Sequence, residues 1–292
     1  MNILNILDEI EKVDGEIYER LSPRRAAMKD FFNMGKKISL AAMPLALGSM
    51  FQKAYGQTNP SGVTEVLNFA LALEYLEYNF YNHALTNSTI AFPTTAARDA
   101  ITTIRAHERA HVDLLKGALN ITGADGYVDA DFDFTGSATF GTAFADVFSN
   151  YATFLKVATA FEDTGVRAYK GQAPVLKGMP VLTTALRIHS VEARHASHLR
   201  QMTAVALGGP LALKPWIAYA ANGNDTGIAQ VNDVYAGEQT TTQAGIDITT
   251  LFGSTITGAV AQTAAAESFD EFLTGSSVKK IANIFIKTKK LS

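Results

Sequence analysis

The short pattern Glu-x-x-His occurs twice in this chain, and this repetition constrains the fold more than any other feature. Glu108 and His111 lie within R-A-H-E-R-A-H-V-D-L-L, and Glu192 and His195 lie within R-I-H-S-V-E-A-R-H-A-S-H-L-R. Residues three apart share one face of an α-helix, so each pair can reach a single point in space. Chance alone gives about 0.3 such pairs in a chain of this length, so finding two is informative. The sequence therefore predicts two helices that direct a carboxylate and an imidazole toward a common site.

The spacing of apolar and helix-breaking residues predicts an all-α protein built on four long helices. We expect these helices at residues 59–85, 93–120, 142–170 and 180–207. Short links within each pair, and one long connection between the second and third helices, predict an antiparallel four-helix bundle with a long crossover. That connection contains Asp125–Phe134, whose alternating pattern favours an extended rather than a helical segment.

The two halves of this bundle resemble each other, and the likeness selects two further candidate ligands. Each half consists of a helix with an isolated glutamate, followed by a helix with Glu-x-x-His. When the halves are overlaid, Glu74 aligns with Glu162, whereas Glu77 aligns with Gly165. Glu74 is therefore the better candidate ligand of the two glutamates in the first helix.

Two isolated glutamates and two Glu-x-x-His pairs make up the ligand set of carboxylate-bridged two-metal centres in helical bundles. The chain has no cysteine, so any metal must be held by oxygen and imidazole, which suits iron or manganese. The alternative is that the glutamates of the two pairs lie on solvated helix faces and bind nothing. We predict two metal ions, iron or manganese, with the ligands Glu74, Glu108, His111, Glu162, Glu192 and His195.

Four other residues are expected to lie close to these ligands. Tyr81 and Tyr169 each follow an isolated glutamate by two helical turns, where they could donate hydrogen bonds to ligands, relay electrons or pack in the core. Glu77 is expected beside the ligands or in solvent. His189 precedes Glu192 by three residues and is expected to support it.

The segment His107-Glu108-Arg109-Ala110-His111 also matches the zinc peptidase motif H-E-x-x-H. In such enzymes both histidines bind zinc and the glutamate activates water. The metzincin extension is absent, because Leu114 and Gly117 stand where glycine and histidine are needed. The counterpart of His107 in the second half is Val191, so a zinc peptidase is the less favoured alternative.

Longer stretches of the chain carry a resemblance to a known family. They are L-N-F-A-L-A-L-E-Y-L-E-Y-N-F-Y (Leu67–Tyr81), F-E-D-T-G-V-R-A-Y-K-G (Phe161–Gly171), the two Glu-x-x-His helices, V-Y-A-G-E (Val234–Glu238) and E-S-F-D-E-F-L-T (Glu267–Thr274). At these residues the chain resembles the ferritin-like superfamily, and specifically its bacterial ferritin-like domain proteins related to plant desiccation-related proteins. The resemblance implies a ferritin-like four-helix bundle with metal ligands at the six positions predicted above, and it implies no established reaction. Cage-forming ferritins, by contrast, are shorter and lack the flanking segments of this chain.

Residues 1–56 have the character of an export signal. A basic segment with Arg24-Arg25 precedes an apolar run, Ile38–Phe51, and Ala54-Tyr55-Gly56 forms a small-x-small cleavage site. The arginine pair resembles the twin-arginine signal, although Ala26-Ala27-Met28 replaces the usual hydrophobic pair. We expect a twin-arginine-like signal and a periplasmic protein without a stable membrane span after signal removal. A retained anchor and a packed helix are the alternatives.

The remaining chain divides into residues 57–208, the bundle, and residues 209–292, a C-terminal extension. We expect the extension to pack on the bundle or to mediate a homodimer. Its last helix is expected to be capped by Ser276, and Glu238 is expected at the surface.

The function predicted from these features is that of an exported two-metal protein. Its redox chemistry would act on a small oxidant, oxygen or peroxide, or on ferrous iron. The alternative is a non-enzymatic envelope or stress-related structural protein with the same bundle. The net charge is −3, and no basic stripe is interleaved with aromatic residues, so no nucleic-acid partner is expected.

Overall fold

The computed structural model of the chain describes residues 61–121, 126–209, 213–218, 225–254 and 256–292. The predicted export signal at residues 1–56 lies outside the described residues. Within the described ranges, no helix is both long enough and apolar enough to cross a membrane.

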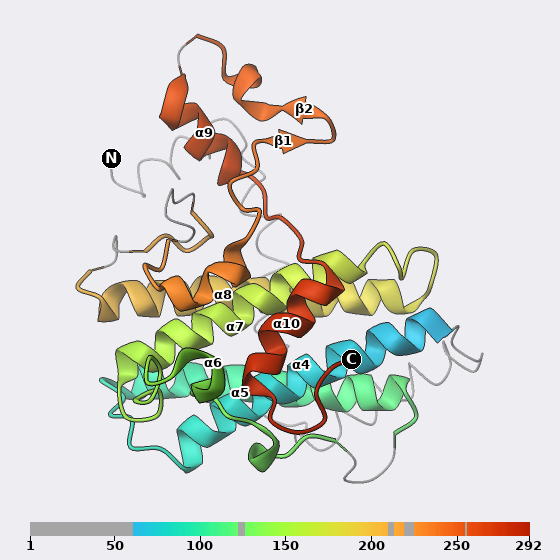
Figure 1. The fold of residues 1–292 in the computed structure, drawn as a ribbon, viewed down its shortest axis with the longest axis vertical. Coiled ribbons are helices and arrows are strands. Elements are labelled where there is room, and N and C mark those ends of the chain that lie inside the picture. Colours follow the sequence, from blue (N-terminus) through green and yellow to red (C-terminus); the bar gives the residue numbers. More distant parts are fainter. Residues whose placement is uncertain (1–60, 122–125, 210–212, 219–224, 255) are drawn as a thin grey trace, which may run out of the picture. The chain divides into compact units, whose positions relative to one another are not determined.

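Four long helices form the body of the described structure (Figure 1). They are α4 (Ser61–Thr86), α5 (Thr95–Ala118), α7 (Tyr151–Gln172) and α8 (Val181–Ala206). Helix α4 packs along α5, α7 packs along α8, and the two pairs meet through α4 with α7 and α5 with α8. The predicted all-α four-helix bundle is therefore confirmed.

Helices α4 and α7 are the inner helices of this arrangement. Every residue of the ranges 69–77 in α4 and 157–169 in α7 is buried, which is the pattern of helices that are covered on all sides. Each has its pair partner on one side, and α10 (Gly275–Phe285) packs against both of them. A polar side chain in the middle of either helix must therefore find its partners inside the protein.

Helix α7 begins at Tyr151, although the apolar spacing predicts a start near residue 142. Asn150 caps the helix, because its side-chain oxygen accepts hydrogen bonds from two N–H groups of the first turn at 3.0 and 3.3 Å. Before it come α6 (Ser137–Phe140) and turns at residues 141–149, in which Phe144 and Val147 are buried. These two side chains are buried although they lie in turns, so their apolar spacing does not indicate a continuous helix.

At its other end, α7 continues through Gly171, the predicted stop, to Gln172. A Cβ atom on Gly171 would lie 2.1 Å from the carbonyl oxygen of Leu273. The N–H of Leu273 donates to the carbonyl of Arg167 at 3.2 Å. The glycine therefore allows a close approach of the C-terminal segment and does not terminate the helix.

The long crossover between α5 and α7 is extended only in part where the structure describes it, at Val128 and Phe132. It contains a short 3₁₀ helix, η1 (Asp129–Asp131), followed by a single β-bridge between Phe132 and Ile286. Asp131 forms an ion pair with Lys289 at 3.1 Å, so the acidic loop is attached to the C-terminal end of the chain.

The C-terminal extension contains several small elements in addition to α10, and of these η2 packs against α10. In chain order they are η2 (Ala229–Tyr235), β1 (Thr242–Gln243), β2 (Ile246–Asp247), η3 (Ile248–Phe252) and α9 (Gly258–Ala266). The two strands pair antiparallel, and α9 packs on η3. The cap of α10 is Thr274, whose side chain accepts from the N–H of Ser277 at 3.2 Å, so the prediction of Ser276 as the cap is wrong.

A buried polar network joins η2 to the bundle. The guanidinium of Arg200 in α8 lies 2.6 Å from carboxylate oxygens of both Asp163 and Asp225. The hydroxyl of Tyr235 donates to Asp163 at 2.7 Å, and Arg200, Asp163 and Tyr235 are almost fully buried. Because Asp163 neighbours Glu162, this network also positions the part of α7 that carries a predicted ligand.

Replacing Tyr235 with phenylalanine is expected to lower the free energy of unfolding by about 1–3 kcal/mol, because the ring remains but a buried hydrogen bond to a charged carboxylate is lost. Denaturant unfolding of the purified protein measures this change. The matched control is Tyr127→Phe, since the hydroxyl of Tyr127 donates to an exposed backbone carbonyl at 2.7 Å. Equal effects of the two substitutions would contradict the role given to the network.

Candidate metal centre

The six predicted ligands come from the middle of four helices and meet in the interior of the bundle. Helix α4 contributes Glu74, α5 contributes a Glu-x-x-His pair, α7 contributes Glu162, and α8 contributes the second pair. All four glutamates have an exposed fraction of 0%, and the two histidines have 8% and 5%. The alternative that the glutamates lie on solvated helix faces is therefore wrong.

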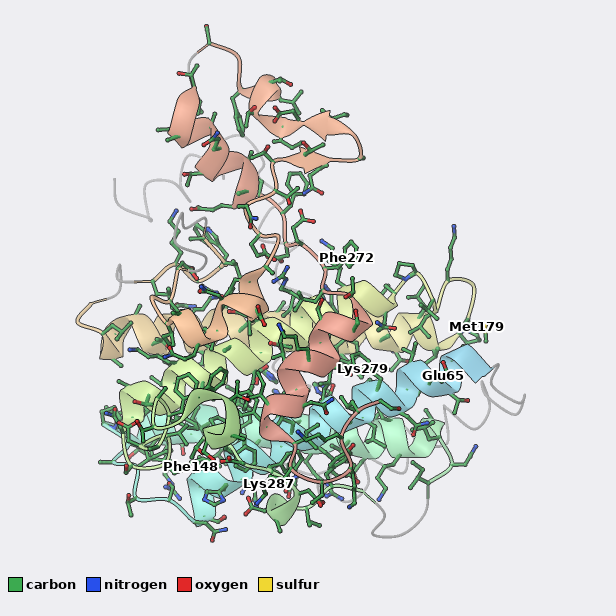
Figure 2. The ribbon with its side chains drawn as sticks, in the orientation of Figure 1. Glu65, Phe148, Met179, Phe272, Lys279 and Lys287 are labelled. Atoms are coloured by element: carbon green, nitrogen blue, oxygen red, sulfur yellow. The ribbon has the colours of Figure 1, made fainter. Side chains whose placement is uncertain are left out.

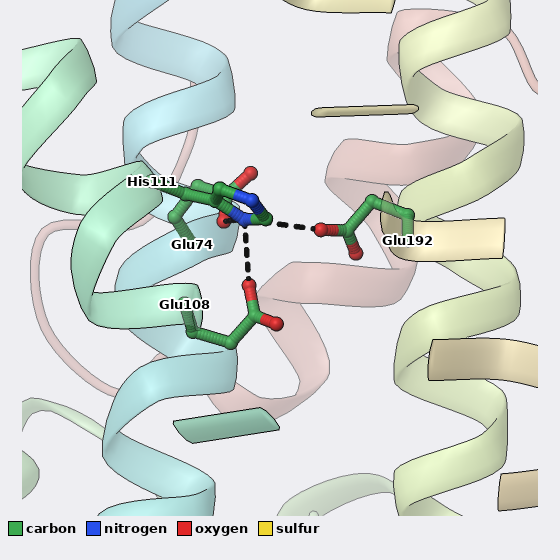
Figure 3. Close-up of side chains that lie close together, drawn as sticks. All are labelled: Glu74, Glu108, His111 and Glu192. Carbon is green, nitrogen blue, oxygen red and sulfur yellow. Dashed lines mark hydrogen bonds and ion pairs between the residues drawn. The ribbon is translucent and has the colours of Figure 1, made fainter. Parts of the chain in front are cut away.

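The first cluster of ligand atoms surrounds the Nδ1 atom of His111 (Figure 3). This nitrogen lies 3.0 Å from Glu74 Oε2, 3.0 Å from Glu108 Oε2 and 3.2 Å from Glu192 Oε1. One imidazole N–H cannot donate well to three carboxylates at once. Three oxygens and one nitrogen that converge in this way are instead suited to surround a cation.

The second cluster surrounds the Nδ1 atom of His195. This nitrogen lies 2.7 Å from Glu108 Oε1 and 3.1 Å from Glu162 Oε2. The cluster also includes Glu192, and in each cluster one ligand atom per residue can be chosen so that all lie within 4.8 Å of one another.

Glu108 and Glu192 belong to both clusters. Glu108 directs Oε2 toward one histidine and Oε1 toward the other. Both oxygens of Glu192 are buried, and neither accepts a well-aligned hydrogen bond from the described residues, although Oε1 lies 3.2 Å from His111 Nδ1. A buried carboxylate in that state is costly unless a cation neutralises it, so the donor set fits the binding of metal ions.

Burial raises the pKa of the glutamates in the centre. It raises the pKa of Glu74 to about 7, although the charge of His111 opposes the shift. Burial and the neighbouring charges of Glu108 and Glu162 raise the pKa of Glu192 well above its usual range. Without a cation, the centre therefore retains protons at neutral pH.

The surroundings of the two histidines favour their charged form, whereas the surroundings of Glu74 and Glu192 favour the neutral form. Burial alone would lower the pKa of His195, but the charge of Glu162 and hydrogen bonds with Glu108 and Glu162 raise it to about 11. For Glu108, burial favours a higher pKa, but the charges of His111 and His195 lower the pKa well below its usual range. Without a cation, the raised pKa values of His111 and His195 therefore favour protonated imidazoles, whose charge offsets part of the carboxylate charge.

The two predicted tyrosines contact the isolated glutamates, each across the bundle. The hydroxyl of Tyr81 in α4 donates to Glu162 Oε1 at 2.5 Å, and the hydroxyl of Tyr169 in α7 donates to Glu74 Oε1. Each half of the repeat therefore supplies the tyrosine that orients the isolated glutamate of the other half. This leaves the second oxygen of each glutamate directed toward a histidine.

Replacing Tyr169 with phenylalanine is expected to weaken Mn²⁺ binding about 10-fold, within the range for loss of an outer partner of a ligand. The ring is retained, but Glu74 loses the donor that holds its orientation. A Mn²⁺ titration monitored by electron paramagnetic resonance measures the affinity. Tyr78→Phe, on the same helix as Glu74 but with a partly exposed ring, is the control. Unchanged affinity in Tyr169→Phe would show that the hydrogen bond does not orient the ligand.

Glu77 lies beside the predicted ligands, so the alternative that it faces solvent is wrong. It is buried, and burial together with the charges of Glu192 and Glu162 raises its pKa well above the usual range. A Cβ atom on Gly165 would lie 2.7 Å from Glu192 Oε2 and 3.2 Å from Glu77 Oε1. The glycine that aligns with Glu77 in the repeat therefore leaves room for both carboxylates.

His189 does not take the place predicted for it, and His107 does not take the place that the less favoured zinc peptidase alternative requires. The Nδ1 atom of His189 lies 3.0 Å from the carbonyl oxygen of Val166, so its support of a predicted ligand is not seen. His107 belongs to neither cluster of potential ligand atoms, whereas Glu108 belongs to both. The geometry therefore does not favour the zinc peptidase arrangement, in which His107 binds the metal and Glu108 does not.

Sequence reasoning did not identify the buried arginines. Arg167 forms an ion pair with Glu238 at 2.8 Å, and both are buried, so the expectation of Glu238 at the surface is wrong. The only available signal is that Arg167 lies within an apolar helix, one turn after Asp163. Such a position requires a partner, but the partner comes from a distant segment that local patterns do not reveal.

The fold and the centre together define a four-helix bundle protein with a buried carboxylate and imidazole site. A family model described as "Ferritin-like domain" matches residues 62–205, which extend from the start of α4 nearly to the end of α8. These residues therefore form a ferritin-like domain, which confirms the resemblance to the ferritin-like superfamily at that level. Its narrower relation to plant desiccation-related proteins remains a prediction. Neither the curated proteins nor the solved structures gave a match.

Proposed function

We propose that this protein binds two metal ions, iron or manganese, in the centre between α4, α5, α7 and α8, and carries out redox chemistry there. The observation that carries the proposal is Glu192, a fully buried carboxylate that belongs to both clusters and accepts no well-aligned hydrogen bond from the described residues. Ferritin-like domains often bind iron, which supports the choice of metal.

The arrangement of the side chains suggests a role for each ligand. Glu108 and Glu192 are placed to hold both ions, and each histidine is placed to hold one. A bound iron or manganese pair would supply one-electron chemistry with oxygen, peroxide or ferrous iron. Because the four glutamates have no exposed surface, the site favours a small oxidant or an ion over a larger substrate.

The test has two stages. Elemental analysis of protein purified without added metal should find two iron or manganese ions per chain. Stopped-flow mixing of the reduced, loaded protein with oxygen or hydrogen peroxide should then show oxidation of the metal and consumption of the oxidant. An inert protein with one tightly held zinc would favour the alternative of a non-enzymatic envelope or stress-related structural protein.

We also propose that the protein is exported through a twin-arginine-like signal. The proposal rests on Arg24-Arg25, the following apolar run and the small-x-small site. Expression of the full chain followed by cell fractionation should locate the protein in the periplasm, and Arg24→Lys combined with Arg25→Lys should retain it in the cytoplasm. Periplasmic protein from both chains would contradict this route.

A further inference from the structure

One exposed histidine contacts the metal centre from outside. The Nδ1 atom of His107 lies 2.9 Å from the Nε2 atom of His195, and the two rings are nearly parallel, with an angle of 9° between them. His107 is exposed, whereas His195 is buried. Because His195 directs its other nitrogen, Nδ1, toward Glu108 and Glu162, its two nitrogens face opposite sides of the site.

This geometry determines the proton positions that metal binding requires. A metal held by Nδ1 of His195 requires that nitrogen to be free of a proton, so the ring proton must be on Nε2. Nε2–H then donates to Nδ1 of His107, whose own proton must be on its Nε2. A partner of this kind fixes both the tautomer and the orientation of a ligating imidazole.

The contact breaks the symmetry between the two halves of the centre. The residue that precedes Glu192 is Val191, whereas the residue that precedes Glu108 is His107. A valine cannot accept a hydrogen bond, so the repeat does not provide His111 with the corresponding partner. The two metal positions therefore differ in the support given to their histidines.

We propose that His107 is a positioning residue that holds His195 in its metal-binding tautomer and makes the position at His195 the more tightly held of the two. The inference rests on the proposed function, because it concerns ligation of a metal ion. His107 itself does not touch the metal. Its role is to accept one hydrogen bond and so to direct Nδ1 of His195 inward.

The experiment compares two substitutions in the full chain. His107→Phe retains a ring but cannot accept a hydrogen bond, whereas His107→Asn places an oxygen where the histidine has Nδ1. Titration with Mn²⁺, monitored by electron paramagnetic resonance of the free ion, measures each binding step. We expect His107→Phe to weaken one step 10- to 100-fold and to leave the other within twofold. His107→Asn should restore that step to within about threefold of the unaltered protein.

Two further comparisons identify the position affected. The change caused by His107→Phe should disappear in a His195→Ala background and persist in a His111→Ala background. The control is His198→Phe, which places the same apolar ring at an exposed histidine one turn after His195. This substitution should change neither binding step.

The outcomes separate this inference from the proposed function. If the unaltered protein binds neither Mn²⁺ nor Fe²⁺, both are overturned. Suppose instead that the unaltered protein binds two ions. Then only the role of His107 is overturned if His107→Asn binds Mn²⁺ as weakly as His107→Phe does. The same holds if His107→Phe still lowers the affinity in the His195→Ala background. Circular dichroism of each variant confirms that a loss does not come from unfolding.

Discussion

Replacing Glu192 with glutamine should weaken Mn²⁺ binding by more than 100-fold at one position or both, while the bundle stays folded. Glu192 belongs to both clusters of ligand atoms, and an amide of the same shape cannot supply the negative charge that two cations share. The expected loss exceeds the 10–100-fold that removal of an outer partner costs. Equilibrium dialysis against Mn²⁺, followed by elemental analysis, measures the number of ions bound.

The same substitution should have the opposite effect on the metal-free protein. In the metal-free protein, burial and the charges of Glu108 and Glu162 disfavour an ionised Glu192. Glutamine cannot ionise, so at pH 8 the free energy of unfolding of the variant is expected to exceed that of the unaltered protein by about 1–3 kcal/mol. Opposite signs with and without metal would distinguish a ligand from a residue with only a structural role.

The control for Glu192→Gln is Glu65→Gln. Glu65 is exposed near the start of α4, as Figure 2 shows, so its loss should change neither metal content nor stability. Unchanged metal content in Glu192→Gln would remove the assignment of the site.

Removal of the metal should reverse the pH dependence of stability. In the metal-free protein, the folded-state pKa of Glu74 is raised from 4.5 to about 7, and that of His195 from 6.5 to about 11. The folded state then binds more protons than the unfolded state, so stability falls as pH rises through these intervals. For Glu74 alone the loss is on the order of 3 kcal/mol. The lowered pKa of Glu108 has the opposite effect on stability. It stabilises the folded protein above the usual pKa of glutamate, and this stabilisation is lost as pH falls below that value.

Metal ions compete with the same protons. Their ligands must be deprotonated, so metal affinity rises with pH. Saturation at 1,000 times the dissociation constant adds about 4 kcal/mol of stability for one site. The stabilisation by Mn²⁺ should therefore be larger at pH 8 than at pH 5.5. Unfolding by guanidinium chloride at both pH values, with EDTA or with Mn²⁺, measures the four stabilities. Metal-free protein that is more stable at pH 8 than at pH 5.5 would contradict the electrostatic account of the centre.

The convergence of the six candidate ligands could be predicted because it depends on local spacing and on an internal repeat. A separation of three residues places a glutamate and a histidine on one helix face, whatever the rest of the chain does. The overlay of the two halves also separated Glu74 from Glu77, which composition alone could not do. Helix boundaries were less predictable, because Phe144 and Val147 have apolar spacing but lie in turns.

The sequence by itself determined the four helices, the two Glu-x-x-His faces and the pairing of isolated glutamates across the repeat. Only the tertiary structure decided which side chains support these ligands. Tyr81 contacts the glutamate of the opposite half, and His107 contacts His195 and belongs to neither cluster of candidate ligand atoms. Such contacts depend on the rotation and depth at which helices pack against one another. Many pairs of distant residues satisfy the same local pattern, and the packing of the whole core selects among them.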